Sequence, residues 1–132
     1  MEKKDLKPAG VFKYFEEICQ VPRPSKKEEK MIAYLKAFGA KHNLETKVDE
    51  AGNVLIKKPA TPGKENLQTV VLQSHIDMVC EKNNDVQHDF LTDPIETEID
   101  GEWLKAKGTT LGADNGIGVA TEQAILAAGS NE

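Results

Sequence analysis

The sequence has little of what several classes of protein require. Cys19 and Cys80 are its only cysteines among 132 residues and lie far apart, so we expect neither a disulfide scaffold nor a zinc site built on paired cysteines. We expect both to be free thiols in a reducing compartment. Arg23 is the single arginine. Arginine clusters that capture phosphate are therefore excluded.

Long apolar runs and an excess of positive charge are also missing. No stretch approaches the ~20 apolar residues that span a bilayer, and residues 1–8 lack the apolar segment of a signal peptide. The 22 acidic residues outnumber the 17 basic ones, which gives a formal net charge of −5. Nonspecific nucleic-acid binding depends on basic residues that displace counterions from phosphates. We therefore expect a cytoplasmic protein with neither a nucleic-acid nor a membrane partner.

Three segments carry the pattern of helices in a composition that is 39% hydrophobic and 30% charged. Apolar residues recur at helical spacing over residues 11–19, and the prolines at 22 and 24 end that helix. Ser25-Lys26-Lys27-Glu28 has the pattern of a capping box, which predicts that a second helix begins there and ends within residues 39–43. Residues 116–128 predict a third, well-buried helix.

Strand-forming segments alternate with these helices. Residues 45–48 and 54–57 flank one turn, which predicts a hairpin or two edge strands. Residues 95–99 and 102–106 flank an Asp-Gly pair, which predicts a hairpin. Residues 69–73 form a continuous apolar, β-branched run, typical of a strand buried on both faces. This order predicts an α/β fold with a mixed, mainly parallel sheet flanked by helices. The chain ends directly after its last predicted helix, which indicates truncation.

The first cluster with chemical potential, Ser74-His75-Ile76-Asp77, follows the apolar run. On an extended chain residues i and i+2 point to the same side, so His75 and Asp77 project together. Ligands bind at the ends of strands in α/β sheets. A histidine there can bind a metal through one ring nitrogen while a carboxylate holds the other. The pair also fits a hydrogen-bonded loop histidine, and the residues alone leave both interpretations open.

The second cluster is a glycine-rich segment, residues 108–118, in which Asp114 is the single acidic residue. Glycine allows a tight loop that holds Asp114 in a fixed place at the start of a helix. The spacing matches neither pattern of a phosphate-binding loop. Asp114 or Asn115 can cap the helix, or Asp114 can offer carboxylate oxygens to one or two metal ions. These two interpretations also stay open.

Together, the two clusters resemble a known family. Residues 71–79, Val-Leu-Gln-Ser-His-Ile-Asp-Met-Val, are similar to the metal-binding strand of the aminoacylase and carnosinase superfamily of metallopeptidases. Residues 108–118, Gly-Thr-Thr-Leu-Gly-Ala-Asp-Asn-Gly-Ile-Gly, together with residues 88–90 and 99–103, narrow the resemblance to the bacterial aminoacyl-histidine dipeptidases, also called Xaa-His or cytosolic non-specific dipeptidases. The resemblance extends from Phe12 to Leu126.

The resemblance implies a role for each of the three polar residues. His75 corresponds to a histidine that binds one zinc ion, and Asp77 to the catalytic carboxylate that orients it. Asp114 corresponds to the aspartate that bridges two metal ions, and the peptide bond between Asp114 and Asn115 is often cis in the family. The implied activity is hydrolysis of dipeptides, including those with C-terminal histidine, by a metal-activated water. Two divalent ions are implied, zinc with manganese or cobalt as alternatives.

Other parts of the family's pattern have no counterpart here. The glutamate pair that follows the bridging aspartate, the later metal ligands and the lid domain, through which relatives dimerise, are not matched in this sequence. Residues 1–132 are thus expected to be the N-terminal part of a metallopeptidase catalytic domain and to be inactive alone. Two alternatives stay open: an amino-acid deacylase or aminopeptidase of the same superfamily, and a non-catalytic metal-binding or interaction fragment.

Overall fold

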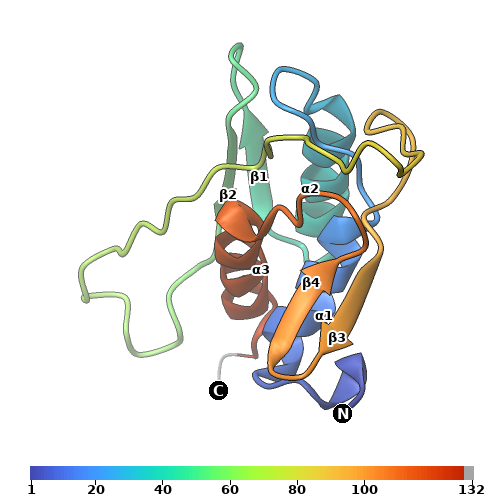
Figure 1. Cartoon of the computed structure of the whole chain (residues 1–132). Helices are drawn as coiled ribbons and strands as arrows, with labels where there is room; N and C mark the ends of the chain where they lie inside the picture. The colour runs from blue at the N-terminus through green and yellow to red at the C-terminus, as the bar shows by residue number, and fades with distance from the viewer. Residues whose placement is uncertain (130–132) are drawn as a thin grey trace.

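The computed structural model describes residues 1–129 and places three α-helices and two hairpins around one core (Figure 1). The elements, in chain order, are η1 (Lys3–Asp5), α1 (Ala9–Cys19), α2 (Glu29–Lys41), β1 (Glu45–Val48), β2 (Val54–Lys57), β3 (Thr97–Asp100), β4 (Trp103–Ala106) and α3 (Ala113–Ala127). Residues 130–132, on which the expectation of a truncated end rests, lie outside the described residues. Among the described helices, none has the length and apolar character needed to cross a membrane.

The core forms where the apolar faces of the three α-helices meet. Helix α1 contributes Phe15 and Ile18, and α2 contributes Met31, all of them almost completely buried. Val119 on α3 packs into the same cluster, and α1 and α3 are in extensive contact. The helical spacing of these apolar residues is what allows each helix to bury one face.

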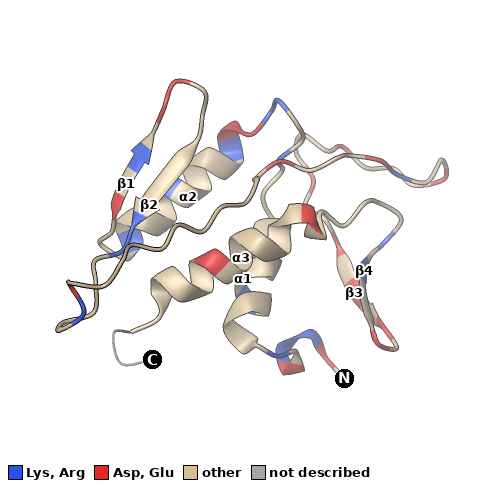
Figure 2. Ribbon diagram, turned by 90° about the vertical axis from the view of Figure 1, so that its left-hand side faces the viewer, with Lys and Arg blue, Asp and Glu red and all other residues tan. Residues whose placement is uncertain are grey.

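The predictions for α1 and for both hairpins are confirmed. Helix α1 ends at Cys19, before Pro22. Strands β1 and β2 pair antiparallel, as do β3 and β4, the latter around Gly101 with its φ of 62°. Basic and acidic residues are interspersed on the two hairpins (Figure 2), and Lys105 lies 2.7 Å from Asp100 across the second turn. Helix α3 covers the predicted segment, but it is buried on one face only, since Ile125 is exposed.

The predicted capping box at Ser25 is wrong. Helix α2 begins at Glu29, and its preceding residue Glu28 accepts a hydrogen bond from the backbone N–H of Lys26 at 2.7 Å. Lys26 has a φ of 70°, in the left-handed region, so the backbone just after Ser25 is not helical. The hydroxyl of Ser25 donates to Asp77 instead of capping α2.

The predicted fold class, an α/β fold with a mixed, mainly parallel sheet flanked by helices, is wrong. The described residues contain two separate two-stranded antiparallel sheets and no parallel sheet. Residues 69–73 form no strand, and Val70 and Val71 are 78% and 79% exposed. In Figure 1 this segment is part of the long yellow-green connection from β2. Strand propensity alone does not make a strand, because the backbone also needs a hydrogen-bonded neighbour.

Candidate metal centre

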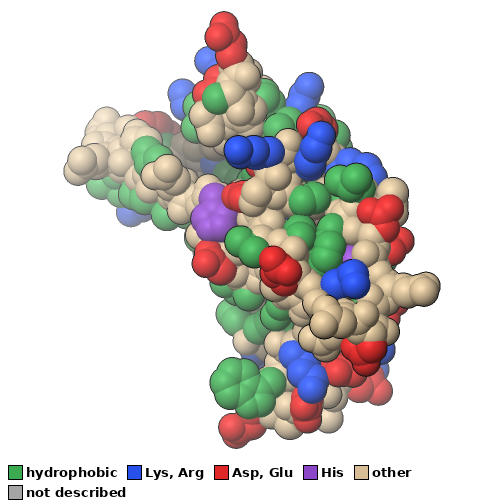
Figure 3. All heavy atoms as spheres, turned by 45° about the horizontal axis from the view of Figure 1, so that its top comes forward, with side chains coloured by type: hydrophobic (Ala, Val, Ile, Leu, Met, Phe, Trp, Pro, Cys, Tyr) green, Lys and Arg blue, Asp and Glu red, His purple; other side chains and the backbone are tan. Residues whose placement is uncertain are grey.

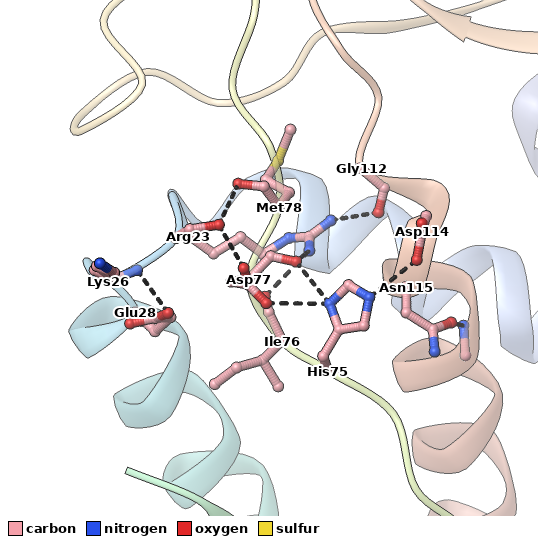
Figure 4. A network of polar contacts seen from close by, with 12 residues as sticks. Arg23, Lys26, Glu28, His75, Ile76, Asp77, Met78, Gly112, Asp114 and Asn115 are labelled. Carbon is pink, nitrogen blue, oxygen red and sulfur yellow. Dashed lines mark hydrogen bonds and ion pairs between the residues drawn. The ribbon is translucent and has the colours of Figure 1, made fainter. Parts of the chain in front are cut away.

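The candidate site forms where three loops converge (Figure 4). His75 and Asp77 lie on the extended segment between residues 69–73 and Met78. Asp114 lies in the first turn of α3, and the segment 23–25 lies in the connection between α1 and α2. An isolated parallel bridge joins Pro24 to Met78, which fixes the loop that carries Asp77 against the segment 23–25.

The imidazole of His75 lies between two carboxylates. Its Nδ1 is 3.1 Å from Oδ1 of Asp77, and its Nε2 is 2.9 Å from Oδ1 of Asp114. The hydrogen bond with Asp114 raises the pKa of His75 above its ordinary value, so the pair favours the protonated ring. The site is open, because 52% of the His75 side chain and 96% of the Asp114 side chain are exposed. Figure 3 shows a histidine at the surface with acidic side chains beside it.

The Asp77 carboxylate is held on both sides. Its Oδ2 accepts a hydrogen bond from the hydroxyl of Ser25, while its Oδ1 faces His75. The Ser25 hydroxyl, and after it the charge of His75, hold the pKa of Asp77 below its ordinary value. Asp77 is therefore an ionised acceptor for the Nδ1–H group of His75.

Asp114 does not cap α3. The residue before α3 is Gly112, which has no side chain to cap it, and within the first turn the side-chain oxygen of Asn115 accepts a hydrogen bond from the backbone N–H of Gly118 at 3.1 Å. Asp114 has φ and ψ of −92° and 102°, outside the helical region, and the peptide bond to Asn115 is cis. The carboxylate of Asp114 is thus left to face the Nε2 atom of His75.

Arg23 links the loop that carries Asp77 to the loop that precedes Asp114, a role that was not predicted from the sequence. Arg23 is 2% exposed, and its guanidinium donates to the carbonyl oxygens of Ile76 at 3.1 Å, Asp77 at 3.3 Å and Gly112 at 2.7 Å. Burial lowers the pKa of Arg23, and a buried cation with fixed acceptors holds the groups around it firmly. The only sequence signal for this role was that Arg23 is the sole arginine and lies between two prolines.

Gly112 makes room for that guanidinium. Its φ of 79° lies in the left-handed region, and a Cβ atom there would collide with Nη2 of Arg23 and lie 2.9 Å from Sδ of Met78. Gly116 is also restricted, although its φ is not in the left-handed region, since its Cβ would lie 2.8 Å from the same nitrogen. Glycine in the loop therefore serves the packing of Arg23 as well as the turn before Asp114.

No protein-family model matches the chain. The chain is 51% identical over 126 residues to the cytosol non-specific dipeptidase of Escherichia coli (strain K12), which is 96% of this chain and 26% of that protein. The resemblance to the dipeptidases is confirmed. The chain spans only about a quarter of the length of this relative.

Two solved structures share the fold. The aminoacylhistidine dipeptidase from Vibrio alginolyticus superposes with a TM-score of 0.93 at 53% identity, covering 97% of this chain and 26% of that one. A tripeptidase from Staphylococcus aureus gives a TM-score of 0.71 at 20% identity, covering 89% of this chain and 31% of that one. The second likeness shows the fold alone. In both cases this chain covers less than a third of the solved structure.

The donor set fits part of a metal site. Two ligand atoms on one tetrahedral zinc, with bonds of about 2.0–2.1 Å, are about 3.3–3.4 Å apart. Nε2 of His75 and Oδ1 of Asp114 are 2.9 Å apart, so a displacement of about half an ångström admits an ion between them. Within residues 1–129, no group of three or more histidine, cysteine or acidic side chains is arranged to hold a metal. His75 and Asp114 are therefore two candidate ligands, fewer than a zinc site requires.

Proposed function

We propose that this chain supplies part of the catalytic domain of a metal-dependent dipeptidase, and that the whole protein hydrolyses dipeptides, including those with C-terminal histidine. One observation carries the proposal: the His75 ring lies between Asp77 and Asp114, three residues that the dipeptidase resemblance marks out. The 51% and 53% identities to two dipeptidases support the substrate class. The name of the E. coli relative supports a cytoplasmic location.

In this proposal His75 and Asp114 bind the metal. The Nε2 nitrogen and the Asp114 carboxylate already face each other, and both are open to solvent, where the remaining ligands can approach. Two divalent ions, zinc with manganese or cobalt as alternatives, would supply a nucleophilic water at neutral pH and stabilise the negative charge that develops on the substrate carbonyl oxygen.

Asp77 has a catalytic role through the histidine. Its carboxylate accepts a hydrogen bond from the Nδ1–H group of His75, so the neutral ring that a metal requires keeps its lone pair on Nε2, the atom that faces Asp114 in this structure. A carboxylate in this position also raises the electron density of the ring and strengthens it as a ligand. Arg23 fixes the backbone on either side, because it binds the carbonyl oxygens of Asp77 and Gly112 together.

The isolated chain is inactive in this proposal, since it offers two ligands where a zinc site needs four or, in a catalytic centre, three plus water. Isothermal titration of the metal-free chain with Zn²⁺ tests this directly. We expect weak binding that is lost in His75→Ala. Tight stoichiometric binding would contradict the claim that the remaining ligands come from other segments.

The substrate class is tested on the complete protein, meaning the product of the whole reading frame that contains this chain. Its rates are measured on a panel of dipeptides, with Xaa-His members included, and on a matched panel of N-acylated amino acids. We expect hydrolysis of the dipeptides. A preference for the acylated compounds would assign the protein to the amino-acid deacylases instead.

A further inference from the structure

Ser25 is a polar residue that the proposed function leaves without a role. The Ser-Lys-Lys-Glu pattern predicts that Ser25 caps a helix, yet α2 begins four residues later. The hydroxyl of Ser25 donates to Oδ2 of Asp77 instead. The backbone N–H of Ser25 also bonds to the carbonyl oxygen of Met78 at 3.3 Å, and the N–H of Met78 bonds to the carbonyl oxygen of Arg23 at 3.0 Å. The loop therefore delivers the Ser25 hydroxyl to Asp77.

The Asp77 carboxylate needs such a partner to keep its orientation. The terminal torsion of an aspartate joins an sp³ to an sp² carbon and has a broad energy profile, so the backbone alone does not set the plane of the carboxylate. Oδ1 is 3.1 Å from Nδ1 of His75. A hydrogen bond on Oδ2 is the contact that keeps Oδ1 in that direction.

We infer that Ser25 is a positioning residue of the site: its hydroxyl fixes the Asp77 carboxylate, and through it the ring of His75. The inference rests on the proposed function for what His75 does, and it concerns what holds that ring in place. A hydroxyl has one proton to donate. The Met78 carbonyl oxygen lies 3.3 Å from the Ser25 oxygen, but the carboxylate is closer and charged, so it takes the proton.

The test on the metal-free chain compares Ser25→Ala with two other variants. Ser25→Thr keeps the hydroxyl. Ser74→Ala is the matched control, because it removes a hydroxyl next to His75 that bonds to Glu122 at 2.8 Å and does not touch Asp77. Three-bond couplings of the His75 side chain, measured by NMR, report whether the ring keeps one rotamer.

We expect Ser25→Ala to average the His75 couplings, and Ser25→Thr and Ser74→Ala to leave them at the wild-type values. Hydrogen exchange of the Met78 amide, bonded to Arg23, shows whether the loop itself is intact. Unchanged couplings in Ser25→Ala would overturn the inference. Averaged couplings together with a freely exchanging Met78 amide would also overturn it, since the hydroxyl would then serve only to tether the loop.

A second measurement separates this inference from the proposed function. In the complete protein, Ser25→Ala is expected to lower Zn²⁺ affinity, by no more than the about 10–100-fold expected for loss of Asp77, which contacts the metal ligand directly, and Ser25→Thr to restore it. A wild-type protein that binds no Zn²⁺ would refute the metal roles of His75 and Asp114, whereas the NMR couplings would still decide the role of Ser25. Wild-type affinity in Ser25→Ala would count against Ser25 alone.

Discussion

Substitution of Gly112 by alanine tests how tightly Arg23 is clamped beneath the site. Gly112 has a φ of 79°, and left-handed backbone costs a residue with a Cβ atom about 1–2 kcal/mol. The new Cβ would also collide with Nη2 of Arg23 and lie 2.9 Å from Sδ and 3.2 Å from Cε of Met78. Overpacking of this kind costs about 1–3 kcal/mol. We expect Gly112→Ala to lower the free energy of unfolding by about 2–5 kcal/mol.

Gly63→Ala is the matched control, because Gly63 has a φ of 87° and a Cβ atom there would meet nothing within 4 Å. It carries the backbone cost of about 1–2 kcal/mol without the packing cost. Urea unfolding followed by circular dichroism gives both values by linear extrapolation. Equal losses in the two variants would refute the reasoning, since Arg23 would then tolerate a methyl group at Gly112.

Three further predictions follow from the same contacts. Asp77→Asn lowers the Zn²⁺ affinity of the complete protein about 10–100-fold, because it removes the carboxylate that orients His75. Asp85→Asn is the control, since Asp85 is exposed, and it leaves the affinity unchanged. Equal Zn²⁺ affinities in the two variants would contradict the orienting role of Asp77. Burial raises the pKa of Cys19 to about 12, so the unfolded chain loses that proton first, and the free energy of unfolding falls by up to about 1.4 kcal/mol per pH unit from about pH 9 to 12. Urea unfolding should find a smaller slope in Cys19→Ala over this range, and equal slopes in the two proteins would contradict the prediction. Val71→Lys changes the free energy of unfolding by less than about 0.5 kcal/mol, because Val71 is exposed. In the comparison variant Ile18→Ala, the loss of a buried side chain lowers the free energy of unfolding by about 2–5 kcal/mol. A loss of that size in Val71→Lys would show that residues 69–73 are packed.

Local patterns were enough to predict the elements that depend on local contacts. Helix α1 follows from apolar spacing and a nearby proline, and the β3–β4 hairpin from an Asp-Gly turn. The prediction of a strand at residues 69–73 was wrong because a parallel strand depends on neighbouring strands distant in sequence, and the described residues supply no such neighbour. The prediction that Ser25 caps a helix was wrong because its hydroxyl donates to the carboxylate of Asp77, 52 positions away.

The candidate site was predictable in the same measure. The proximity of His75 and Asp77 follows from the two-residue repeat of an extended chain. Asp114 lies 39 positions after His75, and only the family resemblance predicted that the two residues belong to one site. Arg23 could not be found, because its partners are backbone carbonyl oxygens, which every residue type presents.

The measurement that tests the central claim most directly is dipeptide hydrolysis by a chimera. The 126 residues of the E. coli cytosol non-specific dipeptidase that match this chain are replaced by their counterparts from it. We expect the chimera to hydrolyse dipeptides, and His75→Ala or Asp114→Asn within it to reduce the rate to background while the fold is retained. A chimera that keeps its rate in both variants would contradict the assignment of these residues to the metal site.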